Sequence, residues 1–315
     1  MKRGKKRDIA AEISNLIISK IESGTLPWRR PWTLTGSGAR EGGRPLRANG
    51  VPYTGINAVY LWAVGDALGY RSRYWMTYKQ ARDLGAQVRR GEGSSLSVFF
   101  NSTQKTVVDK ITGDEATKSI RFMRSYAIFN ADQIDDLPER FRPDALKLEK
   151  PSPSERQAAI DAFFDPIAIE VRHGGDRAFY SPGGDYVQMP PKAAFRSSDH
   201  HAATLAHELG HATGATHRLG RTFGKRFGDR AYAFEELIAD CTSGIICAEL
   251  GLPCELHDSH ASYIEGWLKI LKADKTAIIT AAAQAEKAYR WLAAFSQGEE
   301  EAEETVDDAR IQAHG

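Results

Sequence analysis

Two histidines and a glutamate lie close together in the chain, in a spacing that suits a catalytic metal ion. His207, Glu208 and His211 form the pattern H-E-x-x-H. Residues four apart share one face of an α-helix, so both imidazoles can converge on one zinc ion. Glu208 can then act as a general base toward a water molecule at the open position of the metal. The pattern therefore indicates hydrolysis of a peptide bond.

A helix must carry this pattern, and the surrounding sequence predicts one over 199–213. The segment Ser197–Asp199 supplies N-cap candidates, and Gly214 is a natural stop. Apolar residues recur at i, i+4 and i+7, which gives the helix one buried face, at Leu205, Leu209 and Ala212.

A zinc site needs a third protein ligand, and the sequence offers several. His217 would complete H-E-x-x-H-x-x-G-x-x-H, which is the metzincin spacing. Metzincins also require a methionine turn downstream of the third histidine, whereas the last methionine here is Met189, upstream of the motif. Glu236 and Asp240 lie four apart on a second predicted helix. There the glutamate would bind the metal, and the aspartate would hold a metal-bound histidine. We therefore predict Zn²⁺ bound by His207, His211 and Glu236, with Glu235 and His217 as alternatives. The residue that stabilises the oxyanion stays open among Tyr232, His257, His260 and Tyr263.

Charge is distributed unevenly along the 315 residues. Residues 1–130 contain 22 Lys and Arg against 10 Asp and Glu, whereas residues 131–315 contain 20 against 31. The net charge of +1 hides this contrast. A basic half joined to an acidic half suggests a polyanion-binding module attached to an enzyme.

The remaining composition bears on the compartment. The three cysteines form no C-x-x-C pair, which suits a reducing cytosol. No apolar run is long enough to span a membrane, and the basic N-terminus lacks the apolar core of a signal peptide. We therefore expect a cytoplasmic protein without a membrane partner.

The hydrophobic periodicities predict an α+β fold in two domains. The first, 1–135, has helices at 8–24, 55–69 and 77–85, followed by strands at 96–100, 105–111 and 119–129, with a turn at Gly113-Asp114. A proline-rich linker covers 136–154. The second domain, 155–296, has a helix at 154–164, strands at 167–172, 177–181 and 185–189, the two metal-site helices and a helical pair over 258–295. An acidic, disordered tail is predicted at 297–315.

The strand at 185–189 precedes the metal-site helix and admits two interpretations. As an edge strand it would hold an extended peptide substrate by main-chain hydrogen bonds. As an inner strand it would only complete a sheet.

Cations and aromatic rings alternate through residues 27–130. Single-stranded nucleic acid is bound in this way, because cations follow the phosphates while rings stack on unpaired bases. Most of the rings are equally expected in a core. Candidate DNA-binding residues are Trp28, Arg29, Arg30, Trp32, Arg47, Tyr53, Trp75, Tyr78, Lys79 and Arg89.

The first half resembles the N-terminal domain of the ArdC/TraC family of plasmid antirestriction proteins. The resemblance rests on Trp28, Pro31-Trp32, Asn49, Tyr53-Thr54-Gly55-Ile56-Asn57, Trp75-Met76-Thr77-Tyr78-Lys79-Gln80-Ala81, Gly91-Glu92 and Tyr126-Ala127-Ile128-Phe129-Asn130. The second half resembles that family's zincin-like peptidase domain at Met189-Pro190, the His207 motif, Arg218-Leu219, Glu235-Glu236-Leu237 and Ser262-Tyr263-Ile264.

This resemblance implies more than the spacing does. The first domain would bind single-stranded DNA with little sequence preference, which adds Asn49 and Asn57 to the candidate residues. The second would be a zinc metallopeptidase acting on a protein substrate that the sequence does not reveal. The protein would be carried by a mobile element and would protect incoming DNA from restriction during conjugation. Two alternatives stay open: a DNA-coating protein whose zinc is structural, and a cytosolic zinc peptidase with a basic protein-docking domain.

Overall fold

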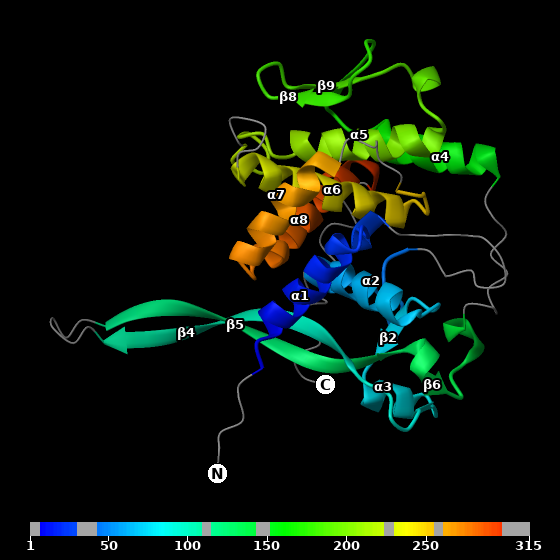
Figure 1. Cartoon of the computed structure of the whole chain (residues 1–315), viewed down its shortest axis with the longest axis vertical. Coiled ribbons are helices and arrows are strands. Elements are labelled where there is room, and N and C mark those ends of the chain that lie inside the picture. Colours follow the sequence, from blue (N-terminus) through cyan, green and yellow to red (C-terminus); the bar gives the residue numbers. More distant parts are fainter. Residues whose placement is uncertain are drawn as a thin grey trace.

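Helices form the middle of the molecule, and small sheets lie at its two ends (Figure 1). The computed structural model describes residues 7–29, 43–108, 115–142, 152–223, 230–254 and 261–297, with the backbone alone at 101–108, 115–122 and 261–262. The predicted turn at Gly113-Asp114, residues 143–151 of the predicted linker and residues 298–315 of the predicted acidic tail lie outside these residues. The α+β class is confirmed.

In its described part, the N-terminal half combines three α-helices with two small sheets. The helix Ile9–Glu22 (α1) is capped by Asp8, whose side chain accepts a hydrogen bond from the backbone N–H of Ala11. The helix Tyr78–Asp83 (α3) begins with a capping box of Thr77 and Gln80. The elements are α1 (Ile9–Glu22), η1 (Pro27–Arg29), β1 (Leu46–Arg47), α2 (Ile56–Leu68), β2 (Tyr74–Met76), α3 (Tyr78–Asp83), β3 (Gln87–Val88), β4 (Ser95–Val108), β5 (Glu115–Asn130), η2 (Ala131–Gln133), β6 (Ile134–Asp135) and η3 (Glu139–Phe141).

A long hairpin dominates this half. Strands β4 and β5 pair antiparallel from Ser95 opposite Ile128 to Val108 opposite Glu115. The inner end of the hairpin continues through β2 to β1, in the order β1-β2-β5-β4, while β3 and β6 form a separate pair. Figure 1 shows the hairpin reaching away from the helices.

The C-terminal half is mainly helical. Its elements are α4 (Pro153–Phe164), β7 (Glu170–His173), β8 (Phe179–Ser181), β9 (Tyr186–Met189), η4 (Lys192–Ala194), α5 (Ser198–Ala212), α6 (Arg230–Glu249), α7 (Ala261–Ala273) and α8 (Ala277–Gln297). Strand β9 pairs with β7 on one side and β8 on the other. The edge-strand interpretation of 185–189 is therefore wrong, because both sides of β9 are already paired within the sheet.

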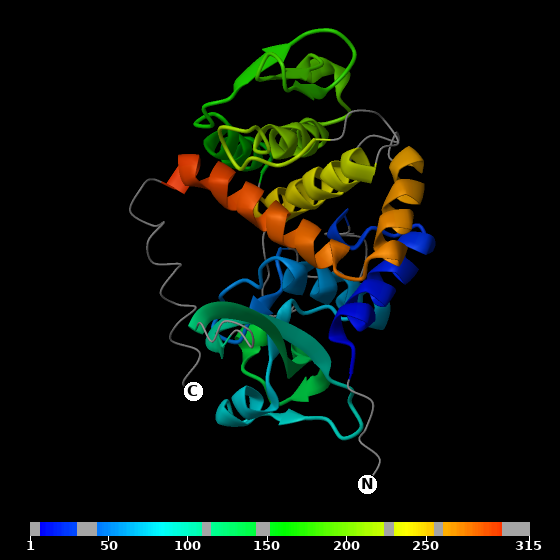
Figure 2. The ribbon, with the colours of Figure 1, turned by 90° about the vertical axis from the view of Figure 1, so that its left-hand side faces the viewer.

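One hydrophobic core joins the two halves. Ile17 of α1 and Leu61 of α2 belong to the same buried cluster as Leu237 of α6, Trp267 of α7 and Ile278 of α8. Figure 2 shows α1 beside α7, with α6 lying between α5 and the N-terminal helices. The boundary predicted near residue 135 thus separates stretches of sequence that share apolar contacts. Within the described residues, no helix has the length and apolar character of a transmembrane segment.

Candidate metal centre

Helices α5 and α6 carry the residues of the predicted metal site. Ser197 caps α5 by accepting a hydrogen bond from the backbone N–H of His200. Inside the H-E-x-x-H pattern, Gly210 allows close packing on α6, since a Cβ there would lie 3.2 Å from the Cα of Ala239. A side chain at position 210 would therefore crowd Ala239 and Thr242 of α6 where the two helices meet.

The donor atoms of His207, His211 and Glu236 face one another. The two Nε2 atoms are 3.2 Å apart, and they lie 3.4 and 3.5 Å from the two carboxylate oxygens of Glu236. Two ligands at about 2.0–2.1 Å from a tetrahedral ion lie about 3.3 Å apart, so one cation fits among the three side chains. Among the described histidines, cysteines and carboxylates, this is the group whose donor atoms come close enough to share an ion.

The electrostatics of this group favour a cation. Burial opposes a charge on His211, but its hydrogen bonds to Glu235 and Glu236 raise the pKa of the imidazole to about 10. Burial alone would raise the pKa of Glu236, yet its contacts with His207 and His211 lower it. The carboxylates of Glu235, Glu236 and Glu208 thus place negative potential on the buried His211 imidazole, which a divalent cation would compensate.

Glu235 does not face this group but supports it. One of its carboxylate oxygens lies 3.4 Å from Nδ1 of His211, on the far side of the ring from Nε2. Arg221 holds the same carboxylate with Nη2 at 2.7 Å and Nε at 3.0 Å, and it also donates to the carbonyl of Gly210. Glu235 thereby orients the imidazole of His211. Sequence reasoning missed Arg221, because a single arginine in a loop carries no recognisable signal.

His217 lies away from the metal group. Its side chain is 62% exposed, and its Nε2 is 3.2 Å from a carboxylate oxygen of Asp185. Arg218 beside it binds the same carboxylate and donates to the carbonyl of Ala212 at the end of α5. The alternative in which His217 is the third ligand is therefore wrong.

Glu208 and two tyrosines surround the metal group. Glu208 is buried, and its charge contributes to the raised pKa of both His211 and Tyr263. The hydroxyls of Tyr232 and Tyr263 are 3.2 Å apart. Burial first, then the contacts with Tyr263 and Glu236, raises the pKa of Tyr232 well above its ordinary value. Both hydroxyls keep their protons as donors, whereas His257 and His260 lie outside the described residues.

Several residues predicted to bind DNA are buried. Trp28 and Trp75 are each 2% exposed and Tyr53 is 6% exposed, so none offers a free ring face to a base. Trp28 and Arg29 instead bind Asp240 of α6. For these four residues the prediction of DNA contact is wrong, because the rings belong to the core and the guanidinium to a buried ion pair.

The other candidates divide into structural and exposed residues. Asn57 pairs its amide with both backbone groups of Val98, which fixes α2 to β4. Asn49 accepts from the backbone N–H of Val51 in a turn, and the Arg47 guanidinium lies over the ring of Tyr53. Tyr78 and Lys79 are exposed. Arg30 and Trp32 lie outside the described residues.

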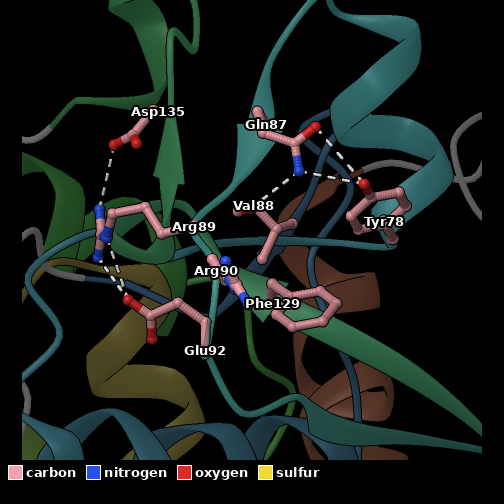
Figure 3. Close-up of a pocket in the computed structure, with 8 residues that line it drawn as sticks. All are labelled: Tyr78, Gln87, Val88, Arg89, Arg90, Glu92, Phe129 and Asp135. Atoms are coloured by element: carbon pink, nitrogen blue, oxygen red, sulfur yellow. Dashed lines mark hydrogen bonds and ion pairs between the residues drawn. The ribbon is translucent and has the colours of Figure 1, made fainter.

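A hollow of about 510 Å³ opens beside Tyr78 (Figure 3). Its lining includes Arg90, Phe129 and Gln87, whose amide donates to the hydroxyl of Tyr78. Arg89 also lines it, but its guanidinium is engaged by Glu92 and Asp135. The hollow is thus lined by two aromatic rings, those of Tyr78 and Phe129, together with hydrogen-bonding side chains. The aromatic residues Phe99, Phe100 and Tyr126 on the hairpin are exposed as well.

Comparison with known proteins identifies both halves. Residues 7–129 match the model of the N-terminal domain of the anti-restriction factor ArdC, and residues 158–284 match that of a zincin-like metallopeptidase. The uncharacterised protein y4eC of Sinorhizobium fredii is 39% identical over 90% of this chain and 91% of its own length. The DNA primase TraC of Escherichia coli is 37% identical over 98% of this chain, which spans only 29% of TraC.

Two solved structures resemble the whole chain. The metal-free crystal structure of the antirestriction protein ArdC from plasmid R388 matches with a TM-score of 0.74 and 43% identity, over 92% of this chain and 98% of that one. Its Mn(II)-bound structure matches with a TM-score of 0.74 and 40% identity, over 93% and 100%. The zincin-like domain and the donor set of α5 and α6 together indicate a divalent-metal centre. The chain belongs to the ArdC antirestriction family, with an ArdC-type N-terminal domain joined to a zincin-like metallopeptidase domain.

Proposed function

We propose that this protein is a zinc-dependent peptidase joined to a single-stranded-DNA-binding domain, and that it protects incoming DNA from restriction during conjugation. The observation that supports the peptidase most directly is the approach of the donor atoms of His207, His211 and Glu236 to within hydrogen-bonding range of one another, with Glu208 beside them. A purely structural metal site has no need of that glutamate.

The residues around the site have separable roles in this proposal. His207, His211 and Glu236 hold the ion, which when bound supplies Lewis acidity toward water and a peptide carbonyl. Glu208 accepts the proton of the attacking water and passes it to the leaving amine. The hydroxyls of Tyr232 and Tyr263 donate hydrogen bonds to the oxygen on which negative charge develops. Glu235, held by Arg221, keeps the ring of His211 in place.

The Glu208→Gln variant of the full chain tests the peptidase. Zinc content should stay at that of wild type, while cleavage of a fluorescence-quenched peptide library should fall by about 100- to 10,000-fold. Equal cleavage by both proteins would remove Glu208 from the mechanism. No cleavage by zinc-loaded wild type would favour the DNA-coating alternative, in which the metal is structural.

The DNA-binding half of the proposal rests on charge and on the hollow beside Tyr78. The basic surplus of residues 1–130 suits phosphates, and the rings of Tyr78 and Phe129 suit an unpaired base. Fluorescence anisotropy with labelled single-stranded and duplex oligonucleotides over a salt series tests it. We expect tighter binding of the single strand and a steep loss of affinity with salt. Affinity for neither DNA would favour a peptidase with a protein-docking domain.

A further inference from the structure

Asp240 is a fully buried carboxylate whose partners come from the opposite half of the chain. Nε1 of Trp28 donates to one carboxylate oxygen at 2.7 Å. Nη2 of Arg29 donates to the other at 2.5 Å, and Nε lies 3.0 and 3.1 Å from the two oxygens. Asp240 has no exposed surface, and the Arg29 side chain is 17% exposed. A buried negative charge of this kind is costly unless it is paired and hydrogen-bonded. The N-terminal half provides both forms of compensation.

The same carboxylate faces the metal group. Asp240 lies one helical turn beyond Glu236 on α6, and its Oδ1 is 4.0 Å from Nδ1 of His207. Nε2 of that ring is the atom that faces His211 and Glu236. A carboxylate behind a metal-binding imidazole sets its tautomer and orientation. The carboxylate of Asp240 thus lies on the Nδ1 side of the His207 ring at 4.0 Å, as that of Glu235 lies on the Nδ1 side of the His211 ring at 3.4 Å.

The segment that carries Trp28 and Arg29 packs tightly against α6 and α7. A Cβ at Gly244 would lie 2.5 Å from the carbonyl oxygen of Trp28, so η1 lies directly against the backbone of α6. The Trp28 ring meets Trp267 edge-on, and Trp267 in turn stacks with Tyr263 beside the metal group. The short segment at Trp28 and Arg29 thus packs against residues that lie beside the metal group.

We propose that Trp28 and Arg29 are positioning residues of the metal centre: they hold the carboxylate of Asp240 so that it orients His207. This inference rests on the proposed metal site. If Trp28 and Arg29 position the metal centre, the N-terminal half is part of the metallopeptidase as well as a DNA-binding module. A zincin-like domain expressed without residues 7–29 would then bind its metal poorly.

Zinc affinity of the full chain tests the inference, measured by competition with a chromophoric chelator. Replacing Arg29 by methionine removes the charge while keeping much of the side-chain volume. We expect Arg29→Met to bind zinc about 10- to 100-fold more weakly than wild type, the usual effect of losing an outer partner of a ligand. Trp28→Phe, which keeps a ring but lacks the donor, should give a smaller loss. Arg29→Lys, which keeps the charge but not the two-pronged geometry, should be intermediate.

Arg44 provides the matched control. Its side chain is even more buried, at 2% exposed against 17% for Arg29, and it also joins the two halves, with Nη1 2.9 Å from Glu286 and Nε against Glu249 of α6. Neither carboxylate belongs to the metal group. Arg44→Met should lower the thermal midpoint but leave zinc affinity within about twofold of wild type, because loosening the interface alone does not move the ligands.

Asp240→Asn completes a double-mutant cycle. If Arg29 acts through Asp240, adding Arg29→Met to Asp240→Asn should weaken zinc binding little further. Wild-type affinity in Arg29→Met, an equal loss in Arg44→Met, or fully additive losses in the double variant would each overturn the inference while leaving the metal site intact. Absence of zinc binding by wild type would instead refute the metal site, and the inference with it.

Discussion

The metal group and the N-terminal aromatic residues were both inferred from the sequence as functional residues. In the fold, the donor atoms of the metal group face one another, whereas several of the aromatic rings are buried in the core. His207 and His211 come together as the spacing of the motif requires, and Glu236 of α6 joins them. Trp28, Tyr53 and Trp75, by contrast, are buried in the core instead of being displayed to DNA. A motif with fixed spacing specifies the relative positions of its side chains. A composition of rings and cations does not specify which of them face solvent.

The largest effect is expected at the metal ligands. His207→Ala and Glu236→Ala should each weaken zinc binding on the order of 1000-fold, since three side chains share a binding free energy on the order of 10 kcal/mol. Atomic absorption after dialysis and chelator competition measure the loss. His217→Ala is the control and should bind zinc as wild type does. A loss in His217→Ala without one in Glu236→Ala would reverse the ligand assignment.

Two aromatic residues sharpen the contrast within the N-terminal half. Trp75→Ala should lower the free energy of unfolding by about 3–5 kcal/mol, because it empties a buried site. Tyr78→Ala should leave stability nearly unchanged but weaken single-stranded DNA binding by about 1–3 kcal/mol, the worth of one stacked base. Chemical denaturation and fluorescence anisotropy separate the two effects. Unchanged DNA affinity in Tyr78→Ala would exclude the hollow in Figure 3 as a base-binding site.

The support of His211 should have a moderate effect. Glu235→Gln keeps the shape of the side chain but removes the charge that faces His211 and Arg221, and it should weaken zinc binding about 10-fold. Asp185→Asn is the matched control, because Asp185 contacts a histidine outside the metal group. If both variants bind zinc like wild type, Glu235 serves only to neutralise Arg221.

The smallest effect concerns pH and His201, a buried residue of α5 that stacks with His173. Burial first, then the charges of Lys192, His173 and His200, lowers the pKa of His201 to about 4. Between its ordinary pKa of about 6.5 and this value, the unfolded chain binds a proton that the folded chain refuses, so stability falls as the pH falls. His201→Phe should remove that contribution.

Thermal unfolding of wild type and His201→Phe at pH 7.5 and pH 5 checks this expectation. The difference in midpoint between the two pH values should be smaller in the variant, since every other titrating group is shared. An equal difference in both proteins would show that His201 does not contribute to the pH dependence.

The sequence alone determined most of the regular structure. The amphipathic period of α1 and the N-cap before α5 are local signals, and both helices begin within one residue of the predicted positions. The sequence also determined which residues could bind a metal, because the i, i+4 spacing fixes two ligands on one helix face. The strands β1, β2, β3 and β6 were not predicted, since two or three residues are too few to show a period of two.

The spacing to Asp240 favoured Glu236 over Glu235, but only the tertiary structure placed Glu236 beside His207. Adjacent positions on a helix differ by about 100°, and the partner helix determines which one faces His207. The tertiary structure also brought Trp28 and Arg29 against Asp240 of α6. Their contact with Asp240 joins residues more than two hundred positions apart. Such a contact arises from the packing of α6 against η1, and no local pattern in either segment encodes it.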